Sequence, residues 1–192
     1  MRYGVKDCKT AIPARLQDLQ DKNMSRGFVK EDDQEEVPRV PQRAFLPDGV
    51  PNFVTSAGME LLLAEKKALL KERDEIDISS ESERRIAANF INAKLQLLNN
   101  RIAEAQVVDP GDQPRDEIRF SAIVTLKVLA TGKTQTLQIV GVDEADISKG
   151  KISFLSPIAR ALMNKKAGEK VVVKRERDEI GFEILKITYS QA

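Results

Sequence analysis

The clearest pattern in the chain is an apolar position that recurs at alternating steps of three and four residues in two neighbouring stretches. In the first stretch the series runs through Met59, Leu62, Lys66, Leu69, Arg73 and Ile76, with Leu63 and Leu70 beside the two basic positions. In the second stretch it runs through Ala88, Ile91, Leu95, Leu98, Ile102 and Ala105. This spacing places the residues on one face of an α-helix. We therefore predict two helices that fold back on each other as an antiparallel coiled-coil hairpin over residues 54–109.

Short polar segments mark the ends of these predicted helices. Thr55 or Ser56 can cap the first helix, and Glu60 then lies in its first turn, where the helix dipole favours negative charge. The segment 77–80 separates the two helices, and the Pro-Gly-rich segment 110–114 ends the helical pattern.

From residue 117 the period of the apolar positions changes to two, which predicts strands in place of helices. The first alternating run contains Ile118, Phe120, Ala122, Val124, Leu126 and Val128. Further strands are predicted at Thr134–Val142, Lys151–Phe154, Val171–Lys174 and Glu183–Tyr189, the last two being joined by a turn at Asp178–Gly181. A short helix is predicted between Ser156-Pro157 and Gly168, because serine caps a helix and proline suits its first position. Residues 115–192 are therefore expected to form an antiparallel sheet with one short helix, which makes the chain an α+β protein.

Residues 1–53 show neither period. An acidic cluster at 31–36 is followed by Pro38, Pro41, Pro47 and Pro51, which predicts a disordered, acidic and proline-rich leader. An alternative is an acidic segment that lies on a basic surface of a partner. We also consider Met24 as an alternative translation start.

Composition restricts the chemistry that the chain can perform. The 31 basic and 30 acidic residues give a net charge of +1, so a general basic footprint for duplex DNA is absent. Histidine is missing and Cys8 is the single cysteine, which excludes a Ser-His-Asp or Cys-His catalytic set and a zinc site with the usual ligands. No apolar run approaches the ~20 residues of a membrane span. We predict a cytoplasmic location without a membrane span and without sequence-specific DNA binding.

The second half of the chain resembles the carboxyl domain of the GreA/GreB transcript-cleavage factors. The residues that carry the resemblance are Ile139–Gly141, Asp143–Asp146, Gly150–Ser153, Ser156–Leu162, Lys165, Lys166, Gly168 and Ile184–Tyr189. Together with the preceding helical hairpin, the resemblance covers about residues 54–190.

The resemblance implies an FKBP-like domain that docks at the rim of the secondary channel of bacterial RNA polymerase. It also implies that the helical arm enters this channel, where acidic residues at its tip help to hold a second Mg²⁺ in the polymerase active site. That ion activates a water molecule for hydrolysis of backtracked RNA, and carboxylates are suitable hard ligands for it. The chain is then an accessory factor without a cofactor or metal of its own, and it meets the 3′ end of the nascent RNA only indirectly.

The candidate tip acids are Asp77, Glu81 and Glu83 in the segment 77–84. Asp77 and Glu83 match the acidic positions of the family tip, whereas the remaining acidic position falls on Ser80, next to Glu81. The alternative is that these are solvated acids of a hairpin loop, favoured by the N-terminus of the second helix.

The candidate docking residues for the polymerase are Asp143, Glu144, Asp146, Ser156 and Pro157. The resemblance supports this assignment, and an exposed acidic loop would suit a basic partner surface. The alternative is an ordinary turn near Gly150 followed by a structural helix cap.

Two other functions stay open. At 1.5 Å per residue the helices span ~27 Å and ~35 Å, shorter than the family arm by about a heptad each, so the chain could occupy the channel without stimulating cleavage. A prolyl isomerase or chaperone is the second alternative, raised by the FKBP-like domain. Its pocket would need aromatic residues, and the domain offers Phe120, Phe154, Phe182 and Tyr189.

Overall fold

The computed structural model describes residues 39–109, 111, 114–175 and 178–189 of the chain. All of them belong to one compact unit, Pro38–Ala192. The acidic cluster at 31–36, Met24 and Pro38 lie outside the described residues.

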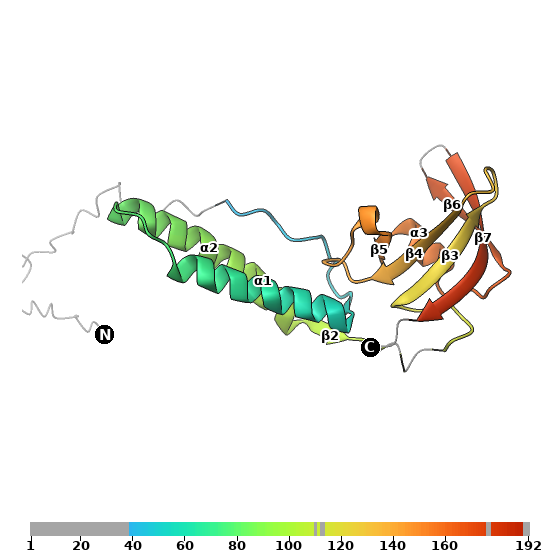
Figure 1. The fold of residues 1–192 in the computed structure, drawn as a ribbon, viewed down its shortest axis with the longest axis horizontal. Coiled ribbons are helices and arrows are strands. Elements are labelled where there is room, and N and C mark those ends of the chain that lie inside the picture. The colour runs from blue at the N-terminus through green and yellow to red at the C-terminus, as the bar shows by residue number, and fades with distance from the viewer. Residues whose placement is uncertain (1–38, 110, 112–113, 176–177, 190–192) are drawn as a thin grey trace, which may run out of the picture. The chain divides into compact units, whose positions relative to one another are not determined.

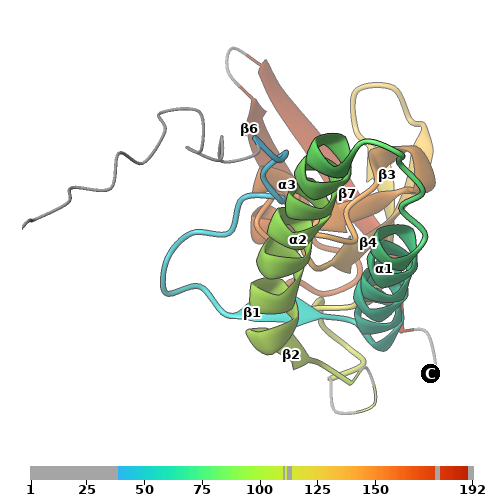
Figure 2. The same cartoon turned by 90° about the vertical axis from the view of Figure 1, so that its left-hand side faces the viewer.

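The predicted helical hairpin is present. Helix α1 spans Ser56–Asp74 and helix α2 spans Glu81–Ala103, and the two lie side by side in Figures 1 and 2. The buried residues of their interface are Leu62, Leu69, Ile91, Leu95 and Leu98. Met59, Leu70, Ile76, Ile102 and Ala105 pack against this core. Both heptad series are therefore confirmed within the helices. Their last positions, Ile76 and Ala105, were expected to be helical, but Ile76 lies after the end of α1 and Ala105 begins strand β2. Leu63, expected to widen the apolar stripe, is exposed.

Polar caps set both helix starts. The Thr55 hydroxyl accepts a hydrogen bond from the amide of Gly58 at 3.0 Å, and the Ser80 hydroxyl accepts one from the amide of Glu83 at 3.4 Å. These bonds satisfy amides that have no partner within the helix. Because α1 begins at Ser56, its first turn contains no acidic residue, and the prediction that Glu60 lies in that turn is wrong.

A small two-stranded sheet closes the base of the hairpin, and the sequence pattern did not predict it. Strand β1 (Asn52–Val54) pairs in parallel with β2 (Ala105–Val107), just before α1 and just after α2. The expected leader boundary at residue 53 therefore falls inside β1. Asn52 and Val54 are buried, so the leader composition did not predict the structure of this stretch.

The C-terminal residues form a five-stranded sheet in the order β5-β4-β3-β7-β6. The strands are β3 (Ala122–Val128), β4 (Thr134–Val140), β5 (Lys151–Ser153), β6 (Lys170–Arg175) and β7 (Asp178–Tyr189). Neighbours are antiparallel except β4 and β5, which pair in parallel. The expectation of a purely antiparallel sheet is therefore wrong. The chain between β4 and β5 crosses over through a turn and the 3-10 helix η3 (Ile147–Lys149), so β5 runs in the direction of β4.

Three predicted boundaries also differ, two of them beside residues with a positive φ. Ser121 has a φ of 69°, which ends the extended run, so Ile118 and Phe120 are buried outside β3. Helix α3 (Pro157–Leu162) stops well before Gly168, and Asn164 has a φ of 65°, a left-handed conformation that asparagine tolerates. The expected turn at Asp178–Gly181 belongs to β7.

The core of the C-terminal domain lies between the sheet and α3. It contains Ile118, Val124, Leu126, Ile139, Ile184 and, from the helix, Ala159 and Leu162, all fully or almost fully buried. Among the described residues no helix is long and apolar enough to cross a membrane.

Candidate functional site

The hairpin tip presents three carboxylates that have no partner among the described residues. Asp77 lies in the turn between the helices, and Glu81 and Glu83 lie in the first turn of α2; all three are exposed. Among the described residues, no hydrogen bond or ion pair involves the carboxylate of any of them. The neighbouring acids differ, since Asp74 pairs with Arg73 at 3.2 Å and Glu75 with Lys71 at 3.6 Å.

Within the described residues, the tip acids do not form a cluster of metal-ligand side chains. No group of three His, Cys, Asp or Glu side chains within the described part of the chain is arranged to hold a metal ion. The Ser80 hydroxyl, at the remaining acidic position of the tip pattern, is occupied by the cap of α2. Carboxylate oxygens are hard ligands that suit Mg²⁺.

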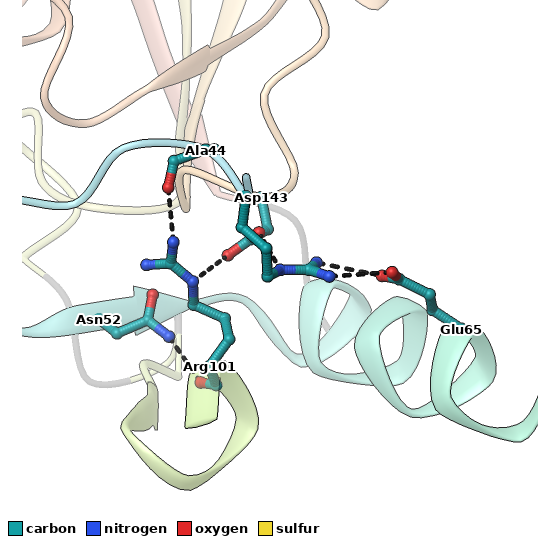
Figure 3. Close-up of polar contacts among 6 residues, drawn as sticks. Ala44, Asn52, Glu65, Arg101 and Asp143 are labelled. Atoms are coloured by element: carbon teal, nitrogen blue, oxygen red, sulfur yellow. Dashed lines mark hydrogen bonds and ion pairs between the residues drawn. The ribbon is translucent and has the colours of Figure 1, made fainter. Parts of the chain in front are cut away.

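The side chain of Asp143 is shielded from solvent, and this corrects the expectation that this acid of the loop is exposed. Its side chain is 7% exposed and lies between two guanidinium groups. Its Oδ1 accepts a hydrogen bond from Nε of Arg43 at 3.0 Å, and its Oδ2 forms an ion pair with Nε of Arg101 at 3.1 Å. Figure 3 shows this carboxylate facing Arg101 of α2. Because both oxygens are engaged within the chain, Asp143 is not available to a basic partner surface.

Glu144 is also buried, and its carboxylate serves the start of α1. The Glu144 oxygens accept hydrogen bonds from the amide of Thr55 at 2.9 Å and from its hydroxyl at 2.6 Å. Gly58 makes room for this contact, since a Cβ at that position would lie 2.1 Å from Cδ of Glu144. A carboxylate at a helix N-terminus is favourably placed in the helix dipole. Glu144 therefore fixes the hairpin to the C-terminal domain.

Asp146 is the solvent-facing acid of this loop. Its carboxylate accepts hydrogen bonds from the hydroxyl and the amide of Ser148 and pairs with Lys149 at 3.0 Å. The hydrogen bond from the Ser148 side chain, followed by that from Lys149, lowers the pKa of Asp146 from 3.8 to about 2. Asp146 therefore stays charged and caps η3, as a turn residue would.

Ser156 and Pro157 occupy the start of α3. The Ser156 hydroxyl accepts a hydrogen bond from the amide of Ala159 at 3.2 Å, and Pro157 takes the first helical position. A structural helix cap was the alternative to a docking role for these two residues. It does not exclude a contact with a partner, since neither residue is fully buried.

Sequence reasoning missed the partners of these acids. Arg43 and Thr55 lie 100 and 89 residues away from Asp143 and Glu144 along the chain. No short-range pattern connects residues at such separations. The sequence pattern gave no reason to select Arg101, because it occupies a polar position of the second helix, outside the apolar heptad series.

An aromatic cluster includes Phe53, which lies two residues before Thr55 in the chain. The ring of Phe53 in β1 lies 5.8 Å from the rings of both Phe120 and Phe154, which are 5.9 Å from each other. Phe182 is buried in the sheet core, and the Tyr189 hydroxyl donates to the carbonyl of Glu117 at 2.6 Å. The aromatic residues considered for a prolyl-isomerase pocket are thus packed against other parts of the chain.

Comparison with known proteins places these features in a family. Residues 113–189 match the family described as "Transcription elongation factor, GreA/GreB, C-term". The chain is 36% identical over 125 residues to the transcription elongation factor GreA of Hyphomonas neptunium, a match that covers 64% of this chain and 80% of that protein. The chain belongs to the GreA/GreB family of transcription elongation factors.

Other relatives of this Gre-family chain carry the same name. The transcription elongation factor GreA of Syntrophotalea carbinolica is 40% identical over 116 residues, which cover 59% of this chain and 73% of that protein. Among solved structures, GreA factor homolog 1 of Thermus thermophilus is 21% identical with a TM-score of 0.34 and covers 72% of this chain and 99% of that one. The GreA/GreB factor from Nitrosomonas europaea is 21% identical with a TM-score of 0.37 and covers 71% and 98%.

Proposed function

We propose that this Gre-family chain is a cytoplasmic accessory factor that binds bacterial RNA polymerase at its secondary channel and stimulates cleavage of backtracked transcripts. The helical hairpin would enter the channel, and its tip would approach the Mg²⁺ in the polymerase active site. The observation that supports this proposal is the set of unpaired carboxylates at the tip, Asp77, Glu81 and Glu83, beside the paired acids Asp74 and Glu75.

The proposed chemistry assigns ligand roles to the tip and leaves catalysis to the polymerase. Asp77 and Glu81 would supply oxygen ligands that complete the coordination of a second Mg²⁺, which in turn activates the attacking water. Glu83, also in the first turn of α2, would add negative charge near the ion. Because the acids do not form a metal cage in the free protein, the ion would be bound only in the complex.

For docking we propose that Asp146 provides the acidic contact of the C-terminal domain, with Ser156 and Pro157 as further docking residues. Asp146 remains charged and reaches solvent, so it suits a basic surface of the partner. Asp143 and Glu144 would contribute indirectly, by holding the hairpin on the domain that docks.

The test is cleavage of RNA in backtracked elongation complexes made with purified polymerase. Wild-type protein is compared with Asp77→Asn and Glu81→Gln, which remove charge while keeping side-chain volume. The matched control is Glu60→Gln, an exposed glutamate near the other end of α1. We expect the tip variants to lose about tenfold or more of the stimulated rate with unchanged polymerase binding, and the control to behave as wild type. Stimulation that is equal in all four proteins would overturn the role of the tip.

A second candidate function is a regulator that occupies the channel without stimulating cleavage. Two observations favour it: the Ser80 hydroxyl caps α2 where an acid would otherwise stand, and the helices contain only 19 and 23 residues. These lengths correspond to ~28 Å and ~34 Å. In the same assay this function predicts measurable polymerase binding, no stimulation by wild type, and displacement of a longer channel-binding factor.

The prolyl-isomerase alternative receives no support from the aromatic packing at Phe120, Phe154 and Phe182. Clear turnover of a short proline peptide by the purified protein would restore it.

A further inference from the structure

Residues 39–51, which we call the strap, run along the base of the hairpin before β1 begins. The strap contains Arg43, whose guanidinium makes contacts in two directions. Its Nη1 and Nη2 donate to the two carboxylate oxygens of Glu65 on α1 at 2.9 and 3.0 Å, and its Nε donates to Asp143 of the C-terminal domain at 3.0 Å. One side chain therefore connects the strap, the hairpin and the C-terminal domain.

A second arginine holds the same strap from the other helix. Nη2 of Arg101 donates to the carbonyl oxygen of Ala44, next to Arg43 in the strap, while Nε of Arg101 pairs with the second oxygen of Asp143. Figure 3 shows Arg101 between Ala44 and Asp143, and Glu65 on the other side of the carboxylate. The Arg43, Arg101 and Asp143 side chains are 18%, 11% and 7% exposed, so these charges are largely shielded from water and salt.

The largest apolar side chain of the strap, Phe45, contributes little to its attachment, whereas Val40, Leu46, Pro47 and Val50 are half-buried. Phe45 is 82% exposed, and a groove of about 850 Å³ lies between the strap and the end of α2, where Leu97 and Asn100 line it. Polar contacts hold the strap at Arg43 and Ala44, and the pairing of β1 with β2 holds its end. Charge-assisted bonds with this geometry are stronger and more directional than neutral ones.

We propose that the strap is an intramolecular latch that narrows the range of orientations between the helical hairpin and the C-terminal domain, with Arg43 as the latching residue. Without the strap the joint retains the bond of Glu144 to Thr55 and the pair of Asp143 with Arg101. The strap thus restricts a joint that already exists. Of the two contacts of Arg43, the one with Glu65 is weaker than the one with Asp143, since the Glu65 carboxylate is 44% exposed and open to screening by salt.

The test measures the distance between two spin labels in the free full-length protein by pulsed electron paramagnetic resonance. The labels are attached to Lys67→Cys on α1 and Lys133→Cys at the β3–β4 turn, both exposed, in a Cys8→Ser background. The latch is released by Arg43→Gln or, without disturbing the buried Asp143, by Glu65→Gln. The matched control is Arg39→Gln, because Arg39 is an exposed arginine of the same strap.

We expect a single narrow distance distribution in the parent protein and in Arg39→Gln. In Arg43→Gln the population at displaced distances should rise about tenfold, the factor that corresponds to loss of one charge-assisted pair. Glu65→Gln should produce part of this change. In 1 M NaCl the distance distribution of the parent protein should become as broad as that of Glu65→Gln, but not broader. Circular dichroism verifies that each variant keeps its helices, and Glu65→Gln alone decides the test if Arg43→Gln does not fold.

The proposal is overturned if Glu65→Gln and every folded Arg43→Gln sample show the same distance distribution as the parent. It is also overturned if the distribution of the control Arg39→Gln broadens as much as that of Arg43→Gln. The experiment contains no polymerase and no RNA. Its failure would therefore leave the proposed function untouched, and the failure of the cleavage assay would leave the latch untouched.

Discussion

The carboxylate of Glu144 accepts hydrogen bonds from both the amide and the hydroxyl of Thr55, the residue that caps α1. Thr55 in turn accepts a bond from the amide of Gly58, so a residue of the C-terminal domain completes the N-terminal cap of a helix in the hairpin. The two parts of the chain are therefore joined by a buried polar contact, whose loss is costly because the remaining groups cannot reach water.

Glu144→Gln should lower the free energy of unfolding by about 1–3 kcal/mol, because it removes the charge that accepts both bonds from Thr55 in a buried place. Urea denaturation followed by circular dichroism measures the change. Glu60→Gln, at an exposed position of α1, is the control and should change stability by less than about 0.5 kcal/mol. Equal stability of Glu144→Gln and the parent would show that the contact is energetically neutral.

Gly58→Ala should destabilise the protein although alanine is the better helix former by about 1 kcal/mol. The added Cβ would lie 2.1 Å from Cδ of Glu144 and would displace its carboxylate from Thr55. In the double variant Gly58→Ala/Glu144→Ala the clash is absent. The double variant should therefore be more stable than the sum of the single changes predicts. Strictly additive unfolding free energies would contradict this coupling.

Ser80→Asp should keep the cap of α2, because aspartate caps helices as well as serine does. It also places a carboxylate at the remaining acidic position of the tip. We expect increased stimulation of RNA cleavage with unchanged stability, whereas Ser80→Ala should lose about 1 kcal/mol of stability and gain no activity. If Ser80→Asp leaves cleavage unchanged while polymerase binding is intact, the channel-occupying function is favoured.

Asp146 should titrate with a pKa of about 2 in the folded protein, below its ordinary value of 3.8, chiefly because the Ser148 side chain donates to the carboxylate. A lowered folded pKa means that the charged form contributes stability above pH ~4. This contribution is lost as the pH falls from about 4 through about 2. Carboxyl-carbon NMR titration measures the pKa, and Ser148→Ala should raise it toward 3.8. An unchanged pKa in Ser148→Ala would assign the shift to another cause.

Much of the secondary structure could be predicted because it depends on local spacing. The heptad series from Met59 and from Ala88 predicted both helices, and Ser80 and Ser156 were visible as caps. The parallel pairing of β5 with β4 could not be predicted. Strand alternation indicates which residues face the core, but it does not specify which neighbour a strand selects.

For the site, the sequence alone determined that acids are concentrated at the tip and in the loop after β4. Only the tertiary structure decided what those acids do. Asp77, Glu81 and Glu83 are exposed, and none of them belongs to the core between the helices. Asp143 and Glu144 are buried because folding brings Arg43, Arg101 and Thr55 against them from distant parts of the chain. Composition and periodicity record which residue types are present and how they are spaced, whereas the partner of a charged group depends on contacts between residues far apart in sequence.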